Sequence, residues 1–338
     1  MSHSRYIRQQ TFQPIGSAGQ RRIEAASAVI VGCGALGSHI ASSLARSGVG
    51  RLRIVDRDVV ELDNLQRQAL FDEDDASRRM PKAIAARRRL GAINSSVAVD
   101  AQVCEVTSAN VESLLDGFDL AMDGTDSVAA RLLVNDACLK AGIPCVFGSA
   151  AGGTGMTMPL VPGATACYRC LMTELPPSGT APTAATAGML HATPATVAAL
   201  QCATALRLLT GQWERGGLLC VDVWEGELTR MEVPRQADCT ACGRGDYEFL
   251  NTPPFREPEP VAGTNSVRLP PVKDTTVDLG RLAERWQGVG EVVANEWLVS
   301  LTAGGRELII FADGRSLVKG TSSVAEAQAL VERRVRGD

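Results

Sequence analysis

The sequence feature that most constrains the fold is a glycine-rich turn between an apolar segment and a helical one. Residues 28–31 (Ala-Val-Ile-Val) predict a buried strand, and the turn after them reads Gly32-Cys33-Gly34-Ala35-Leu36-Gly37. Glycines let such a turn tighten and let backbone N–H groups approach a phosphate at a helix N-terminus. A second predicted strand ends at Asp56, 19 residues after Gly37, where a carboxylate can accept a ribose hydroxyl. The pattern indicates a nucleotide-binding βαβ unit.

The alternation of predicted strands and helices continues to about residue 150. Strands are predicted at 96–103, 119–123 and 144–147, with helical segments between them. This order is typical of the α/β class, with a doubly wound, mostly parallel, Rossmann-like sheet. Ligands of such sheets bind beyond the carboxyl ends of the strands, where Asp56, Asp123 and Asp126 are expected.

The length of 338 residues fits one large α/β domain with an appended module. We expect the large domain to span residues 1–250. Residues 251–271 hold six prolines and predict a linker, and residues 272–338 predict a small α+β module. Within the large domain, residues 176–188 predict a loop rich in Pro, Thr, Ala and Gly. The helix expected from Thr193 to Thr210 is apolar almost all round, so it is predicted to lie in the core or at a subunit interface.

Composition excludes several classes of partner and reaction. The net charge is −4 and no basic stripe is visible, so nucleic acid is not an expected partner. No signal peptide is visible, and the uncharged stretch 141–168 is broken by glycines and prolines, so no membrane span is expected. Ten cysteines without a secretory signal favour a reducing, cytoplasmic location. Only three histidines are present, none with metal-ligand spacing to another, which disfavours imidazole-dependent hydrolysis.

Two Cys-x-x-Cys pairs predict a zinc site. Cys167 and Cys170 form the first pair, and Cys239 and Cys242 form the second, with 68 residues between the two pairs. Four thiolates in this pattern match a closed tetrahedral site that joins distant loops. Such a site would be structural, because four bound sulfurs leave no position for a substrate. The alternative is two unrelated pairs of buried cysteines.

Two cations and two carboxylates are candidates for triphosphate chemistry. A reaction that expels pyrophosphate builds negative charge, which arginine and lysine side chains such as Arg67 and Lys82 can stabilise. The alternative is that both are solvated surface residues. Asp123 and Asp126 can hold magnesium together with substrate phosphates. Alternatively, one of the two caps the helix that starts near Ser127.

The N-terminal residues 5–10 (Arg-Tyr-Ile-Arg-Gln-Gln) precede the nucleotide-binding unit. This arm is either a solvated tail or a segment that reaches the site of another subunit. Composition alone favours the tail.

In their order along the chain these motifs resemble the sulfur-carrier adenylyltransferases of the ThiF/MoeB/HesA family, relatives of ubiquitin-activating enzymes. The resemblance covers about residues 4–245, and residues 261–337 look like the extension carried by some ThiF-like members. The motifs that carry it are Arg5-Tyr6-Ile7-Arg8-Gln9, the glycine turn, Asp56 with Asp63-Asn64-Leu65-Gln66-Arg67-Gln68, Pro81-Lys82, Asp123-Gly124-Thr125-Asp126 and the two Cys-x-x-Cys pairs.

The resemblance implies ATP-dependent adenylylation of the C-terminal glycine carboxylate of a small ubiquitin-fold sulfur carrier protein that ends in Gly-Gly. Pyrophosphate would leave, and an acyl-adenylate would form for sulfur transfer. ATP and Mg²⁺ are the implied cofactors, besides structural Zn²⁺. A carboxylate is already ionised at neutral pH, so no general base is required. One alternative is the same chemistry on a peptide or tRNA-linked carboxylate. Alternatives from other classes are an NAD-dependent dehydrogenase and a non-catalytic scaffold.

The resemblance also implies roles for individual residues. Arg8, Arg67, Lys82 and Asp126 would be catalytic, with Arg8 entering the site of the second subunit of a homodimer. This role replaces the tail interpretation. Asp56 would bind the ribose, and Asp126 would support magnesium. The implied nucleotide-binding set is Gly32, Gly34, Ala35, Gly37, Asp56, Asp58, Asn64, Gln66, Arg67, Lys82, Asp123 and Asp126.

The chain departs from the family pattern at a cysteine. Relatives often carry Thr-Cys-x-x-Ala-Gly in the loop before the buried helix, whereas this chain has Ala184 at the cysteine position. Residues 261–265 (Val-Ala-Gly-Thr-Asn) likewise stand where relatives show Cys-Gly-Arg. An alanine methyl is not a nucleophile, so we expect the enzyme to stop at the adenylate and a separate persulfide donor to act. The remaining cysteines are predicted to be buried structural thiols: Cys33, Cys104, Cys138, Cys145, Cys202 and Cys220.

Overall fold

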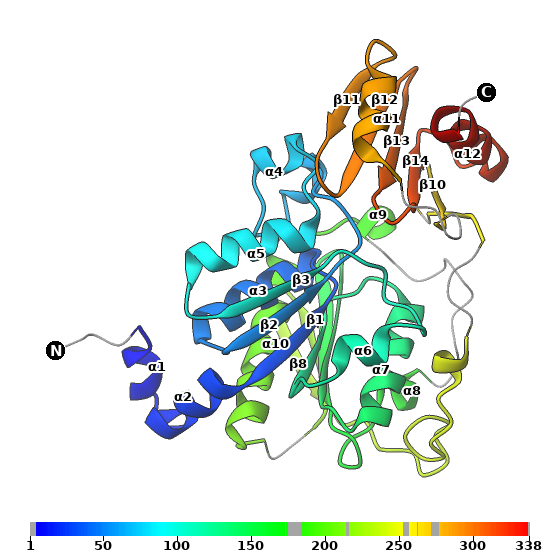
Figure 1. Ribbon diagram of the computed structural model, residues 1–338. Coiled ribbons are helices and arrows are strands. Elements are labelled where there is room, and N and C mark those ends of the chain that lie inside the picture. The colour runs from blue at the N-terminus through cyan, green and yellow to red at the C-terminus, as the bar shows by residue number, and fades with distance from the viewer. Residues whose placement is uncertain are drawn as a thin grey trace. The chain divides into compact units, whose positions relative to one another are not determined.

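The computed structural model describes residues 5–172, 174, 184–213, 216–252, 257–261, 263–271 and 277–336 (Figure 1). The chain forms two compact units, Met1–Thr252 and Pro253–Asp338, each with a sheet of its own. None of the described helices is long and apolar enough to span a membrane.

The sheet of the first unit has eight strands in the order β3-β2-β1-β4-β5-β6-β7-β8. They are β1 (Ser27–Val31), β2 (Arg51–Val55), β3 (Ala98–Gln102), β4 (Leu120–Asp123), β5 (Cys145–Ala151), β6 (Thr154–Leu160), β7 (Leu218–Asp222) and β8 (Glu227–Met231). The pairs from β3 to β5 are parallel, and those from β5 to β8 are antiparallel. The predicted α/β class with a mostly parallel sheet is confirmed, since four of the seven strand pairs are parallel. The change of direction falls where the alternation in the sequence stops.

Helices cover both faces of this sheet, with α3 and α5 on one face and α6 and α7 on the other (Figure 1). The described helices are α1 (Ile7–Thr11), α2 (Gly16–Ala25), α3 (Ala35–Ser47), α4 (Glu73–Ser77), α5 (Lys82–Ile93), α6 (Val111–Leu115), α7 (Val128–Ala141), α8 (Tyr168–Leu171), α9 (Ala184–Ala187) and α10 (Ala192–Thr210), with short 3₁₀ turns η1 (Leu62–Asn64) and η2 (Glu248–Asn251). Most of the loop expected over residues 176–188 lies outside the described residues, and α9 forms its described end.

Strand register brings the carboxyl ends of three strands together. Val31 at the end of β1 pairs with Val55 on one side and Asp123 on the other. Every residue of β1 is buried, as expected for a central strand covered on both faces. The glycine turn after β1, the residues after β2 and the loop after β4 therefore meet at one edge.

Three glycines make this meeting possible. Gly32 has a positive φ of +86°, and a Cβ built on Gly37 would lie 1.8 Å from the Gly32 carbonyl oxygen. A Cβ on Gly124 would lie 2.5 Å from the same oxygen. The glycines are thus required by the close approach of two turns, whatever ligand the turns bind.

Helix α10 is buried on one side only. Val197, Ala198, Gln201 and Ala205 are buried, whereas Ala199 and Ala203 on the other side are exposed. The buried side fits the expected place in the core, and the expectation of a subunit interface for the exposed side stays a prediction.

The second unit has a six-stranded antiparallel sheet in the order β11-β12-β13-β14-β10-β9. Its core includes Trp286, which is 1% exposed. The elements are β9 (Glu259–Pro260), β10 (Ser266–Leu269), α11 (Leu279–Trp286), β11 (Glu291–Ala294), β12 (Leu298–Ala303), β13 (Arg306–Phe311), β14 (Ser316–Lys319), α12 (Val324–Val331) and the π-helix η3 (Glu332–Arg336).

Residues 251–271 were expected to form a linker, but they include β9 and β10, which belong to this sheet. β10 pairs with β14, and β9 pairs with β10 at the edge. Proline is tolerated on an edge strand because its missing N–H removes no ladder bond there, so Pro260 does not prevent pairing. The high proline content therefore predicted a linker over residues that in part form strands.

Candidate functional site

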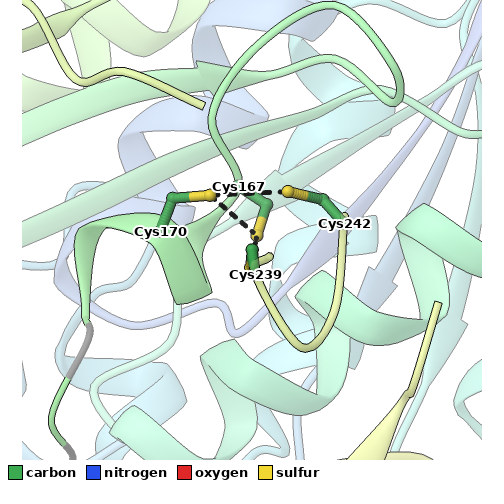
Figure 2. A group of neighbouring side chains, drawn as sticks. All are labelled: Cys167, Cys170, Cys239 and Cys242. Atoms are coloured by element: carbon green, nitrogen blue, oxygen red, sulfur yellow. Dashed lines mark hydrogen bonds between the residues drawn. The ribbon is translucent and has the colours of Figure 1, made fainter. Parts of the chain in front are cut away.

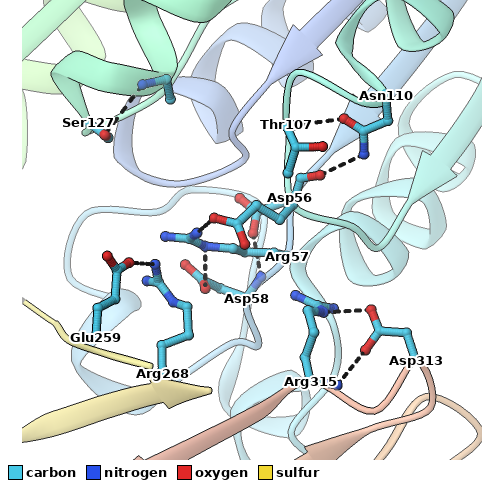
Figure 3. Close-up of polar contacts among 12 residues, drawn as sticks. Asp56, Arg57, Asp58, Thr107, Asn110, Ser127, Glu259, Arg268, Asp313 and Arg315 are labelled. Atoms are coloured by element: carbon cyan, nitrogen blue, oxygen red, sulfur yellow. Dashed lines mark hydrogen bonds and ion pairs between the residues drawn. The ribbon is translucent and has the colours of Figure 1, made fainter. Parts of the chain in front are cut away.

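Asp56 binds the glycine turn at the end of β2. Its Oδ2 accepts the Cys33 N–H over 2.6 Å. Its Oδ1 accepts the Asp58 N–H over 2.7 Å (Figure 3). Burial raises the pKa of Asp56, and the neighbouring Lys82 ammonium acts in the opposite direction. The carboxylate is therefore held at the strand end where a ribose is expected. Its contact with a ribose stays a prediction.

Lys82 begins helix α5 and is buried at the same edge. Its N–H donates to the Asp58 carbonyl over 2.9 Å, and its Nζ lies 3.5 Å from Asp58 Oδ2 on a side chain that is 9% exposed. Burial lowers the pKa of Lys82, but the carboxylates of Asp58, Asp56 and Asp126 outweigh burial, and the net shift is upward. The alternative of a solvated surface lysine is wrong.

Arg67 follows the short turn η1, and its side chain is 19% exposed. The guanidinium donates to the Asp63 carbonyl over 2.7 Å and lies 3.8 Å from the Asp63 carboxylate. The structure therefore holds Arg67 against its own turn and does not show a contact with Lys82.

Asn64 closes this turn from inside. Its Oδ1 accepts the Glu61 N–H over 3.3 Å, and its Nδ2 donates to Asp63 over 2.9 Å. Asn64 is buried, so its side chain shapes the turn that presents Arg67.

The two aspartates after β4 lie in different surroundings. Asp123 is 2% exposed; its Oδ1 accepts the Thr125 N–H and hydroxyl, and its Oδ2 lies 3.3 Å from Arg131 Nε. Burial raises the pKa of Asp123, and Arg131 opposes the rise. Asp126 is exposed and close enough to Lys82 to raise the pKa of that lysine.

The helix-cap alternative for these aspartates is wrong. Ser127 caps α7 by accepting the Ala130 N–H (Figure 3). Because Arg131 already pairs with Asp123, Asp126 is the carboxylate of the two that stays open to an incoming cation.

Arg57 also belongs to the site, although the sequence analysis did not predict it. Its guanidinium pairs with Glu105 and lies 3.7 Å from Asp58 (Figure 3). Burial lowers the pKa of Arg57, but Asp58, Glu105 and Asp126 outweigh it and raise the pKa. Its position directly after Asp56, at the carboxyl end of a predicted strand, was the sequence signal that could have indicated it. Arg57 and Lys82 thus place two cations among several carboxylates at the carboxyl edge of the sheet.

The four cysteines of the two Cys-x-x-Cys pairs converge on one point (Figure 2). All four Sγ atoms lie within 4.8 Å of one another, with separations of 3.7 Å between Cys167 and Cys239 and 3.4 Å between Cys170 and Cys242. Tetrahedral Zn–S bonds of about 2.3 Å place sulfurs about 3.8 Å apart. The donor set fits zinc, and the alternative of two unrelated pairs is wrong.

Buried polar residues of α7 support the cysteine cluster. Asn135 Oδ1 accepts the Tyr168 N–H over 2.8 Å, next to Cys167. The adjacent Asp136 accepts the Phe249 N–H over 3.0 Å, and burial raises the pKa of Asp136 to about 6. These residues hold the first Cys-x-x-Cys and the end of the unit to the same helix.

The N-terminal arm docks at the opposite edge of the sheet. Tyr6 accepts a hydrogen bond from Asn94 over 2.7 Å, and its ring occupies the space where a side chain on Gly48 would lie. Asn94 and Gly48 follow α5 and α3, whose first residues lie at the site. A helix of 13 residues is about 20 Å long, so the arm is about that far from its own glycine turn.

Arg8 on this arm is exposed, and its guanidinium makes no hydrogen bond or ion pair with any residue that the structure describes. The structure therefore does not bring Arg8 together with Arg67 and Lys82 of the same chain.

The remaining cysteines offer no reactive thiolate in the described site. Cys33 in the glycine turn is fully buried, and burial raises its pKa. Burial likewise raises the pKa of Cys202 to about 12. Cys104 and Cys220 are only partly buried, which differs from the expectation that all six are core residues. Ala184 occupies α9, where relatives were expected to carry the loop cysteine.

Known proteins share this organisation. The ThiF family profile matches residues 6–241. The "Sulfur carrier protein ThiS adenylyltransferase" of Bacillus subtilis (strain 168) is 40% identical over 332 residues, which cover 97% of this chain and 98% of that protein. The "Sulfur carrier protein adenylyltransferase" of Thermus thermophilus is 39% identical over 246 residues, or 71% of this chain and 90% of that protein. A crystal structure of E. coli MccB shares the fold with a TM-score of 0.63 at 24% identity, over 72% of this chain and 73% of that one.

Proposed function

This chain belongs to the ThiF family and is an adenylyltransferase, and we propose that it adenylylates the C-terminal glycine carboxylate of a small sulfur carrier protein. Similarity to the named Bacillus subtilis enzyme along nearly the whole chain supports the substrate class. The single observation that carries the chemistry is the buried, charged Lys82 among the carboxylates that follow the glycine turn.

The reaction follows from the charges of the reactants. A carboxylate oxygen of the carrier attacks the α-phosphorus of ATP, and the bond from that phosphorus to the β,γ-diphosphate leaving group breaks. The products are an acyl-adenylate and pyrophosphate. The attacking carboxylate carries no proton at neutral pH, so no side chain has to remove one. The residues have to orient the two reactants and stabilise the developing negative charge.

The described residues suit this task. The N–H groups at the start of α3 would face a phosphate of the nucleotide at the favourable end of the helix. Asp56 would accept the ribose hydroxyl, and Lys82 would neutralise charge on the phosphates. Arg67 would join Lys82 by exchanging its bond to Asp63 for a phosphate oxygen. An Asp63 carbonyl is a weaker partner than a charged phosphate, so this exchange is favourable.

Magnesium is proposed at Asp126, whose exposed carboxylate is close enough to Arg57 and Lys82 to raise the pKa of both. Mg²⁺ prefers one or two carboxylates together with substrate phosphates, and it supplies neutralisation of phosphate charge when bound. Asp123 would act indirectly, by holding Arg131 and the backbone of the loop before Asp126.

We propose a homodimer in which Arg8 completes the site of the partner subunit. The arm is anchored by Tyr6 on the far edge of its own sheet, so Arg8 cannot reach its own glycine turn. Ile7 and Phe12 beside it are 48% and 60% exposed, which provides apolar contact area for a second copy.

Sulfur transfer is proposed to use a separate donor. Ala184 offers no nucleophile, and the buried Cys33 thiol has a raised pKa. A persulfide on another protein, or sulfide, would therefore attack the carbonyl carbon of the adenylate and displace AMP.

The test is pyrophosphate–ATP exchange with a recombinant ubiquitin-fold carrier that ends in Gly-Gly, preferably the one encoded beside this gene. Exchange of label that needs both the carrier and Mg²⁺ is expected. The same carrier without its last two residues is the matched control and should give none. Label exchange that persists with the truncated carrier would contradict the proposal, as would NAD reduction without ATP turnover.

A further inference from the structure

The segment 188–191, which leads into α10, is fixed on one side by the end of β5. The Gly152 N–H donates to the Gly188 carbonyl over 3.0 Å, and the Leu190 N–H donates to the Gly152 carbonyl over 3.0 Å. Met189 and Gly152 form an isolated parallel bridge. The segment therefore has a defined position on the scaffold of the first unit.

Its other side binds Gln66 by two reciprocal contacts. Gln66 Nε2 donates to the Met189 carbonyl over 3.2 Å, and His191 Nδ1 lies 2.9 Å from the Gln66 carbonyl oxygen. A carbonyl oxygen can only accept, so His191 Nδ1 carries the proton and donates it. We call this pair of hydrogen bonds, between Gln66 and residues 189–191, the clasp.

The His191 ring is also held from the side of the glycine turn. It packs edge-on against His39 of α3, with ring centroids 5.5 Å apart and an interplanar angle of 62°. Burial lowers the pKa of His39, and His191 adds to this effect, whereas the Arg67 backbone opposes it. His191 thus contacts both the helix after the glycine turn and the residue next to Arg67.

We propose that His191 is a positioning residue for Arg67, holding the 64–67 turn through the Gln66 carbonyl so that the arginine is presented to the nucleotide. The inference rests on the proposed function, since it assigns Arg67 to the phosphates. The sequence alone had indicated no role for His191.

The geometry explains why one hydrogen bond matters here. The Arg67 N–H already donates to the Asn64 carbonyl over 3.0 Å, and Asn64 is held from inside the turn. The clasp fixes the Gln66 carbonyl, which belongs to the same peptide unit as the Arg67 N–H. The peptide unit that precedes the Arg67 Cα is then held at both its C=O and its N–H, so the Arg67 side chain can move from Asp63 to a phosphate while the Cα stays in place.

The test compares His191→Phe, which keeps a ring and removes the donor, with His191→Asn, whose side-chain amide can replace the Nδ1–H. In the exchange assay with a Gly-Gly carrier, we expect His191→Phe to lower kcat roughly three- to tenfold, the effect of one hydrogen bond, with little change in KM for ATP. His191→Asn should recover most of this loss. In an Arg67→Met background, His191→Phe should cause no further loss, because the residue it positions is absent.

A second measurement needs neither ATP nor carrier. Amide hydrogen exchange of a peptide covering residues 62–70 should be faster in His191→Phe than in the unaltered protein and should be restored in His191→Asn. Unchanged amide exchange, an equal loss of kcat in the Arg67→Met background, or a loss expressed only in KM would each overturn the role of His191. If the unaltered protein shows no pyrophosphate exchange, the proposed function fails, whereas amide exchange still decides whether His191 holds the turn.

Discussion

The ammonium group of Lys82 lies 3.5 Å from the Asp58 carboxylate, while the N–H of Lys82 binds the Asp58 carbonyl. Two contacts to one residue fix both ends of the lysine relative to the glycine turn. We expect Lys82→Met to lower the pyrophosphate exchange rate by a factor of about 10² to 10³, the effect of losing one charged donor at the transition state. Lys140→Met is the matched control, because Lys140 is half exposed and pairs with Glu112 on the surface. A Lys82→Met enzyme within threefold of the unaltered one would contradict the assignment.

The cysteine cluster should bind one zinc per chain. Cys239→Ser should remove the metal and lower the melting temperature by on the order of 10 °C or more, because metal-binding free energy contributes to folding. Elemental analysis and thermal unfolding measure the two effects. Cys220→Ser in β7, outside the cluster, should retain zinc. Soluble, active protein without zinc would show that the four thiols do not need a metal.

Arg8→Ala and Arg67→Ala should each lower the exchange rate by a factor of about 10² to 10³ when alone, and the two variants should complement each other when mixed. In a twofold dimer with sites completed in trans, random exchange of subunits restores one site in half of the dimers, so activity should reach about a quarter of the unaltered level. Arg21→Ala, which changes an exposed residue of α2, is expected to be active by itself. If mass spectrometry shows mixed dimers and the exchange rate of the mixture stays at the level of the separate variants, Arg8 does not act across subunits.

Ala184 leads to an expectation about covalent chemistry. Intact-mass spectrometry after addition of the carrier and Mg-ATP should show free carrier, carrier adenylate and unmodified enzyme. No adduct sensitive to dithiothreitol should form, because the site lacks a thiolate. An adduct that dithiothreitol removes would mean that another cysteine has taken the missing role, and tryptic mapping would then identify it.

Asp136 predicts a pH dependence of stability. Burial raises its pKa to about 6 in the folded protein, above the ordinary value for Asp. Between these two values the unfolded carboxyl has lost its proton while the folded one keeps it, so the free energy of unfolding should fall as pH rises from about 4 to 6. Asp136→Asn should flatten this slope in urea unfolding measured across that range. An unchanged slope in the variant would assign the dependence to other groups.

The sequence by itself determined the nucleotide-binding unit, the α/β class and the four cysteines that converge. Each of these rests on local chemistry. Glycine alone permits the turn at Gly32, strand and helix periodicity follows from neighbouring residues, and thiolates spaced Cys-x-x-Cys bind metal whatever surrounds them. The proline-rich segment before residue 272 was predicted to be a linker, whereas it contains β10. Local sequence could not show this, because the pairing of β10 depends on β14, which lies far along the chain.

Only the tertiary structure decided which polar groups meet. The pairing of Arg131 with Asp123, the position of Arg57 beside Glu105 and the docking of Tyr6 on Asn94 join residues from different elements. The clasp between Gln66 and His191 spans 125 residues. Such contacts depend on how helices and strands pack, and packing selects one partner among many residues of equal local chemistry. For that reason the sequence predicted most of the candidate residues, but not Arg57 or His191, whereas the state of each one, buried or open and paired or exposed, required the folded chain.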